Sequence, residues 1–275
     1  MFWLMMGLLL VVFTFLDPFV TSLLYNANSV FGSIVHYIAH IPSYTLMLMS
    51  VLMVFKYVST LNIKYKVQWL VLIGLFYFVV GFMFMVMVRD LYGWFFSFIV
   101  VLAMMNLTLM VFSRMKDAWV ESGFKVAVFY MVSLVLSFFV VYVIKSVWMR
   151  ERFMSFEDVS MVRYWFEFQG FSGVYEHNSF PSGHVASAAL MLVFWFVGKD
   201  FFKNNTVITF SVALWIVLVS IGRIVDGYHF MTDAVVSVMI VYGVMVLVDK
   251  WLLGYALKFV DLWKHRFQVS ETDGV

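Results

Sequence analysis

The sequence predicts an all-α protein, a polytopic membrane helix bundle, from three observations. Of its 275 residues, 64% are hydrophobic and only 12% are charged, against about 25% charged residues in soluble domains. The mean hydropathy is +0.96, and apolar runs near the roughly 20 residues that a bilayer requires recur along the whole chain. Lys and Arg gather in alternate connections between these runs. We therefore expect an integral membrane protein surrounded by membrane lipids.

Eight apolar runs are candidate membrane spans. Asp17 and Pro18 interrupt the first run, the sixth run is short, and the third and fourth meet at Arg89 and Asp90, which predicts a tight helical hairpin. The N-terminal run lacks a preceding basic segment and a small-residue cleavage site, so we expect a retained first helix rather than a signal peptide. The eight runs are residues 2–24, 42–58, 67–88, 91–112, 124–144, 184–198, 206–224 and 231–251.

The distribution of positive charge predicts the orientation of these spans. The connections after the second, fourth and sixth spans and the C-terminal tail together hold twelve of the 18 Lys and Arg residues. Short loops rich in Lys and Arg remain cytoplasmic, so both termini are expected to be cytoplasmic and the loop 145–183 to lie on the other side. The twelve residues are Lys56, Lys64, Lys66, Arg114, Lys116, Lys125, Lys199, Lys203, Lys250, Lys258, Lys264 and Arg266.

No internal repeat, linker or low-complexity tract divides the chain, so residues 1–275 are expected to form a single membrane domain. Within it we distinguish N-terminal spans (1–123), a core that carries the polar motifs described next (124–256) and a cytoplasmic tail (257–275). The segment 26–41 is too short and too polar to span a membrane, and we expect it at the interface. The absence of Cys excludes disulfides, thiolate metal sites and a Cys nucleophile. The net charge of +2 gives no sign of a nucleic-acid partner, and we expect none.

Three polar clusters break the apolar pattern, and all three fall on the expected non-cytoplasmic side. In the first, KSVWMRER, the cations Lys145 and Arg152 are seven residues apart and would share a helix face. A basic flank that extends to the lipid headgroups is the alternative interpretation. Polar groups at the ends of membrane helices are costly and therefore candidates for function.

The second cluster is FPSGH, residues 180–184, at the start of the sixth run. Ser182 is a good N-cap, and the N–H groups of a helix N-terminus bind anions. Gly183 would let the backbone approach such an anion, and His184 adds a proton that titrates near neutral pH. A capped helix start with an unused histidine is the alternative.

The third cluster is GRIVDGYHFMTD, residues 222–233. His229 and Asp233 are four residues apart and would share a helix face. A carboxylate that accepts one imidazole N–H leaves the other nitrogen more nucleophilic. Arg223 offers a planar fork that suits phosphate. Together the clusters predict an oxyanion site with an acid and a nucleophile, whereas the cations disfavour a metal site.

These clusters resemble the type 2 phosphatidic acid phosphatase family, which shares its active site with vanadium haloperoxidases. The family motifs are Lys-x6-Arg-Pro, Pro-Ser-Gly-His and Ser-Arg-x5-His-x3-Asp. The resemblance covers roughly residues 140–250 and implies a six-span phosphatase-like core with three spans before the first motif, where we count five. Phe153 stands in place of the motif proline and Gly222 in place of its serine. The motifs here are Lys145-x6-Arg152-Phe153, Pro181-Ser182-Gly183-His184 and Gly222-Arg223-x5-His229-x3-Asp233.

The resemblance implies a lipid phosphatase that hydrolyses a phosphomonoester or pyrophosphate of a lipid without a metal or other cofactor. His229 is implied as the nucleophile that forms a phosphohistidine, Asp233 as its orienting carboxylate, and His184 as the acid and base. The phosphate-binding residues implied are Lys145, Arg152, Ser182, Gly183 and Arg223. Undecaprenyl pyrophosphate, phosphatidylglycerophosphate and phosphatidic acid are possible substrates, in a bacterial cell membrane.

Other functions fit parts of the same pattern. A lipid-linked phosphotransferase would use the same histidine but pass the group to a hydroxyl, and it would release no free phosphate. A haloperoxidase would bind vanadate. A transporter or lipid-binding protein would not need the His and Asp residues at the helix ends, and transporters more often carry charges at mid-membrane. The aromatic loop 153–180 is expected to shape the entrance, His177 to be a loop residue, and His36 and His40 to be structural.

Overall fold

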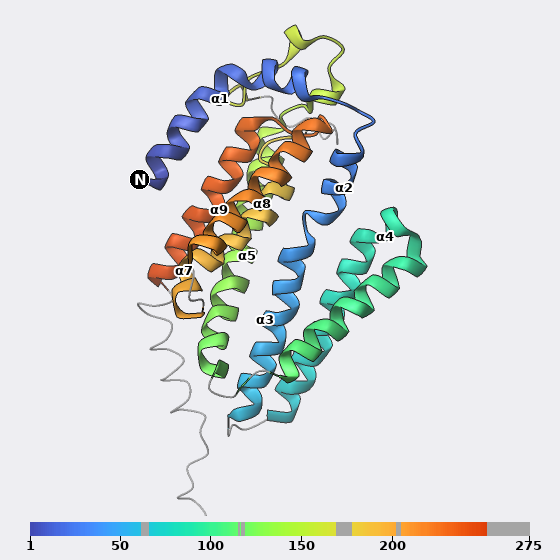
Figure 1. Ribbon diagram of the computed structural model, residues 1–275, viewed down its shortest axis with the longest axis vertical. Helices are drawn as coiled ribbons and strands as arrows, with labels where there is room; N and C mark the ends of the chain where they lie inside the picture. The colour runs from blue at the N-terminus through green and yellow to red at the C-terminus, as the bar shows by residue number, and fades with distance from the viewer. Residues whose placement is uncertain (62–65, 115, 117–118, 169–177, 202–204, 252–275) are drawn as a thin grey trace, which may run out of the picture. The chain divides into compact units, whose positions relative to one another are not determined.

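The computed structural model describes all residues except 62–65, 115, 117–118, 169–177, 202–204 and 252–275. The described part consists of helices, turns and loops, with no strand within it, which confirms the all-α prediction. The nine α-helices of the described residues are α1 (Phe2–Leu24), α2 (Val30–Ile38), α3 (Ile41–Thr60), α4 (Lys66–Ser113), α5 (Val120–Trp148), α6 (Gly183–Ala189), α7 (Val193–Phe201), α8 (Asn205–Val225) and α9 (Met231–Trp251) (Figure 1). Short 3-10 turns lie at Phe153–Ser155, Val159–Met161 and Leu190–Leu192.

Among the described residues, seven helical segments are long and apolar enough to cross a membrane. An eighth apolar helix, Gly183–Val197, is shorter than a span and corresponds to the short sixth run of the sequence. Because α4 contributes two of the seven segments, these eight helices match the eight runs one for one. The prediction of a polytopic membrane helix bundle is confirmed.

The helical hairpin expected within α4 is present, but its reversal lies slightly later than Arg89 and Asp90. The break is at Gly93, where φ is 67° and ψ is 169°. Glycine adopts a positive φ without the steric cost of a Cβ, which is why the chain turns at this residue. The Tyr77 hydroxyl joins the two arms, donating to the Met105 carbonyl at 3.0 Å and lying 2.7 Å from the Thr108 hydroxyl.

The chain divides into two compact units. Unit 1 contains residues 1–43 and 133–245, and unit 2 contains residues 44–132 and 246–275. All three polar clusters of the sequence fall in unit 1. The single membrane domain over residues 1–275 stays a prediction, and the tail at 257–275 lies outside the described residues.

Helix α8 is at the centre of unit 1, where it contacts α1, α2, α6 and α7. Helix α1 runs beside α9 in the opposite direction: near its start Phe2 stacks on Tyr242 with ring centroids 3.7 Å apart, and near its end Asp17 accepts the Thr232 N–H at 3.1 Å. The C-terminal ends of α5 and α8 and the N-terminal ends of α6 and α9 lie at one end of unit 1 (Figure 1). This arrangement gathers the three clusters at that end.

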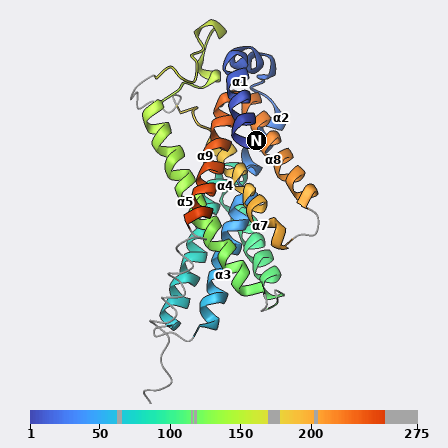
Figure 2. The same ribbon diagram turned by 90° about the vertical axis from the view of Figure 1, so that its left-hand side faces the viewer.

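Within the segment 26–41, which is expected at the interface, residues 30–38 form α2, which packs along α8 (Figure 1, Figure 2). Two glycines permit this close approach. A Cβ added to Gly222 of α8 would lie 2.5 Å from the Cβ of Val35, and one added to Gly32 would overlap the Asp226 carboxylate. The serine that the family motif carries at position 222 would therefore not fit here without moving α2.

Replacing Gly222 with Ser tests this contact. Overpacking a well-filled interface typically costs about 1–3 kcal/mol, so we expect G222S to lower the thermal unfolding midpoint in detergent. Gly7→Ser on α1 is the matched control, because no atom lies within 4 Å of a Cβ added there. Equal unfolding midpoints for the two variants would contradict the packing of α2 on α8.

Candidate active site

Asp233, in the first turn of α9, is fully buried, and both of its carboxylate oxygens accept hydrogen bonds. Arg150 Nη1 donates to Oδ1 at 2.6 Å. The backbone N–H of Phe230 donates to Oδ2 at 2.9 Å, and the Ser179 hydroxyl donates to the same oxygen. A charged group buried in this way needs such partners to remain ionised. Asp233 is thus a fixed negative charge at the base of the site.

His229 lies beside this carboxylate. Its side chain is 5% exposed, and its Nδ1 is 3.5 Å from Asp233 Oδ2, at the outer limit of a hydrogen bond. The spacing of four residues therefore brings the pair together as the sequence predicted. Burial lowers the pKa of His229 to about 3, which keeps the ring neutral at neutral pH. With its proton on Nδ1, facing Asp233, the ring carries a lone pair on Nε2.

Arg223, at the end of α8, is 1% exposed and is held by residues of α2 and of the loop between α8 and α9. Its Nη1 lies 2.7 Å from His36 Nδ1 and 2.8 Å from Asp226 Oδ2. Its Cζ lies 4.4 Å from the centre of the Tyr228 ring. The guanidinium plane is therefore fixed on several sides, as a phosphate-binding fork requires.

The two cations of the first cluster approach the same region. Lys145 Nζ donates to the carbonyl of Ser179 at 3.3 Å and to that of Asn178. The Arg152 guanidinium is 8% exposed and lies 4.8 Å from the centre of the Tyr228 ring, which Arg223 also contacts. Arg152 and Arg223, 71 residues apart in sequence, thus share one aromatic neighbour.

The second cluster begins α6 as the sequence predicted. The Ser182 hydroxyl caps the helix by accepting the Val185 N–H at 3.4 Å, and the Ser182 N–H donates to the backbone carbonyl of Asp233 at 3.4 Å. A Cβ added to Gly183 would meet no atom within 4 Å. The open space beside Gly183 is where an anion could approach the backbone.

His184 packs against two histidines of the N-terminal region. Its ring centroid lies 4.4 Å from that of His40 and 4.9 Å from that of His36. His36 of α2 and His40 of the turn that follows α2, which the sequence suggested to be structural, thus both lie against His184. His177, expected to be a loop residue, lies outside the described residues.

Sequence analysis missed a buried ion-pair network under the site. Arg150 Nη1 binds Asp233, and its Nη2 donates to Asp17 Oδ2 at 3.2 Å. Asp17 also accepts from the backbone N–H and the hydroxyl of Thr232. Arg150 and Asp17 are 1% and 0% exposed. The sequence did contain an indication of this network, because Asp17 interrupts an apolar span. Ionisable groups within spans are candidates for function.

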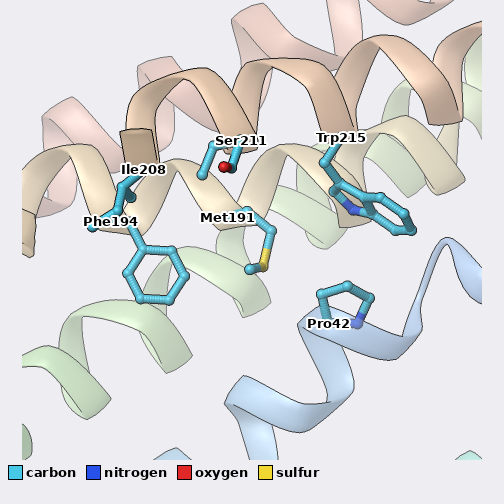
Figure 3. Close-up of a pocket in the computed structure, with 7 residues that line it drawn as sticks. Pro42, Met191, Phe194, Ile208, Ser211 and Trp215 are labelled. Carbon is cyan, nitrogen blue, oxygen red and sulfur yellow. The ribbon is translucent and has the colours of Figure 1, made fainter. Parts of the chain in front are cut away.

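An apolar cavity of about 240 Å³ opens within unit 1, between the first turn of α3, the α6–α7 segment and α8 (Figure 3). Two of its lining residues lie on segments that also carry site residues. Met191 follows His184 by seven residues and Trp215 precedes Arg223 by eight, which is about 10–12 Å along a helix. The cavity is lined by Pro42, Met191, Phe194, Ile208, Ser211, Val212 and Trp215.

A cluster of three or more metal-binding side chains does not occur among the described residues. Four cations, Lys145, Arg150, Arg152 and Arg223, instead surround the two histidines and Asp233. This donor set suits an anion. It can bind a phosphoryl group, present a neutral imidazole to it and supply a second imidazole for proton transfer.

The fold and the site define the protein as a polytopic helical membrane protein with a cationic, histidine-containing anion site. Residues 126–254 match the family model of the PAP2 superfamily. This match confirms the resemblance seen in the three motifs. The match indicates phosphatase activity on phosphate esters. Comparison with curated proteins and with solved structures gives no significant match.

The matched region contains all eight site residues that the sequence predicted, from Lys145 to Asp233, and all eight lie in unit 1. Asp17, His36 and His40 lie before it. The structure therefore adds side chains from α1 and α2 to a site that the family match alone would place entirely between α5 and α9.

A double-mutant cycle on Asp17 and Arg150 tests the network. Arg150→Ala leaves two buried carboxylates unpaired, and breaking a buried pair typically costs about 3–5 kcal/mol. We expect the double variant, D17A with R150A, to lose less stability than the sum of the two single variants, measured by unfolding in detergent. Arg163→Ala is the control, because that side chain is exposed and only its backbone carbonyl contacts Arg150. Additive losses would rule out the coupling.

Proposed function

We propose that the protein is a membrane lipid phosphatase that hydrolyses a phosphomonoester or pyrophosphate of a lipid through a phosphohistidine. The observation that carries this proposal is the buried His229–Asp233 pair at 3.5 Å within a group of cations. A neutral imidazole beside a fixed carboxylate is a nucleophile, and the cations compensate the charge of the phosphoryl oxygens.

In the first step, the substrate phosphate is held by Arg223, Arg152 and Lys145, with the Ser182 hydroxyl and the N–H groups of Gly183 and His184 on another side. The lone pair of His229 Nε2 attacks phosphorus and forms the N–P bond. The bond from phosphorus to the lipid oxygen breaks, and its electron pair leaves with that oxygen. Protonated His184 donates its proton to the leaving oxygen, which departs as a neutral hydroxyl, or as a phosphate if the substrate is a pyrophosphate.

In the second step, the now neutral His184 accepts a proton from water as the water oxygen attacks phosphorus. The N–P bond breaks, its electron pair returns to His229, and inorganic phosphate is released. His184 regains the proton that it gave in the first step, so both histidines end in their starting state. Asp233 keeps the His229 ring oriented and stabilises the positive charge that it carries in the intermediate.

Two features support a lipid as the substrate. Seven helices of the described chain have the length and composition of membrane spans, so the site lies in a protein whose surroundings are lipids. The apolar cavity between the α6–α7 segment and α8 (Figure 3) is lined by Met191 and Trp215, which lie about two helical turns along the chain from His184 and Arg223. We assign it to the first part of the lipid chain, with the phosphate bound above it.

The distribution of Lys and Arg supports a site on the non-cytoplasmic side of the membrane, which we propose to be a bacterial cell membrane. A site there would act on lipid phosphates whose headgroups face away from the cytoplasm. The loop that follows α5 lies at the site end of unit 1, since the Met154 N–H donates to the Gly227 carbonyl at 3.0 Å.

Phosphate release from a panel of lipid phosphates in detergent tests the function. We expect release by the wild-type protein that persists in EDTA, because protein cations supply the charge compensation, and we expect His229→Ala to abolish it. Ser33→Ala, on the exposed face of α2, is the control. Phosphate release by His229→Ala at the wild-type rate would refute the assignment of His229 as the nucleophile. Transfer of the phosphoryl group to an added hydroxyl acceptor without free phosphate would instead identify a phosphotransferase.

Filling the apolar cavity tests the assignment of the lipid chain. Ser211→Trp places a large ring in the cavity, so we expect the KM for a long-chain lipid phosphate to rise while turnover of a water-soluble phosphomonoester is unchanged. Ala213→Trp is the matched control, because Ala213 is an exposed residue of α8 outside the cavity lining. The same change in KM for both variants, or for neither, would refute a chain-binding role.

A further inference from the structure

We infer that His36 of α2 is a positioning residue for Arg223: it orients the guanidinium toward the phosphoryl group without cancelling its charge. This inference rests on the proposed function, since it deepens the description of the same phosphate site. His36 lies outside the region that matches the family model, residues 126–254, and outside the three motifs.

The contact between the two residues determines the state of the His36 ring. Arg223 Nη1 and His36 Nδ1 are 2.7 Å apart. Because a guanidinium can only donate hydrogen bonds, Nδ1 of His36 has to be the acceptor. The ring is therefore neutral at this contact, with its proton on Nε2. A protonated His36 would place an N–H against an N–H and lose the bond.

A neutral acceptor has a specific advantage at this position. Arg223 Nη1 already donates to the Asp226 carboxylate at 2.8 Å, and this negative charge offsets part of its attraction for an anion. A second carboxylate would offset more of it and would repel a phosphate dianion directly. The imidazole of His36 supplies the second hydrogen bond, and therefore the orientation, without adding negative charge.

The packing of α2 explains how His36 reaches Arg223. Val35 lies against Gly222, the residue before Arg223. A side chain at position 222 would overlap Val35. The start of α2 is fixed by the Ser29 hydroxyl, which accepts the Gly32 N–H at 3.1 Å. The position where the family motif has serine is thus occupied by a glycine that lets α2, and with it His36, approach the end of α8.

The test must separate the hydrogen bond to Arg223 from the packing of His36 on His184, because the two ring centroids are only 4.9 Å apart. His36→Asn and His36→Asp form a suitable pair. Both remove the imidazole ring and have nearly the same shape. Asn presents a neutral carbonyl oxygen near the position of Nδ1, whereas Asp presents a negative charge there.

The measurement is binding of inorganic orthophosphate to the full-length protein in detergent by calorimetry, together with the KM of a lipid phosphate. We expect H36N to bind orthophosphate within about threefold of the wild type and H36D to bind at least about tenfold more weakly, since like charges in contact are costly. H36A, which lacks the acceptor, should fall between them. KM should follow the same order.

Ser33→Asp is the control for charge alone, because it adds the same charge to an exposed position of the same helix. Equal orthophosphate affinity of H36N and H36D, or an equal loss in S33D and H36D, would overturn the role of His36. That outcome differs from failure of the proposed function, in which the wild-type protein releases no phosphate from any lipid phosphate. A wild-type protein that does not bind orthophosphate would overturn both.

Discussion

The buried Arg150 guanidinium, held between the carboxylates of Asp17 and Asp233, is the interaction on which the site of this protein depends. It joins the end of α5 to α1 and α9 at distances of 3.2 and 2.6 Å. A single buried charge of this kind would be prohibitively costly, and each of the three groups is stabilised only because the others are present. The orientation of Asp233, and through it that of His229, follows from this network.

The charges of the site are arranged around this fixed centre in two functional sets. Arg150 is committed to two carboxylates, so its charge is largely compensated within the protein. Arg152 and Arg223 contact the Tyr228 ring, and Arg223 also contacts the Asp226 carboxylate at 2.8 Å. The structure thereby separates a cation paired with two carboxylates from the cations that we propose to bind phosphate, although Arg150 and Arg152 are only two residues apart in sequence.

Much of the site could be predicted from the sequence, because its spacing is local. His229 and Asp233 are four residues apart at a helix start, and Ser182 precedes a helix, so helical geometry alone places these groups. The membrane spans were likewise visible, since a span needs only a long apolar run. The packing of residues 30–38 on α8 could not be predicted in this way, because short amphipathic segments look alike whether they face lipid headgroups or another helix.

The sequence by itself determined the membrane class, the order of the helices and the three motifs, because these depend on composition and on spacing within one helix or loop. Only the tertiary structure decided which partners complete the site. Asp17 is 133 residues from Arg150, and His36 is 187 residues from Arg223. No periodicity links residues so far apart. Their meeting depends on the packing of α1 along α9 and of α2 on α8, where Gly222 leaves room for Val35.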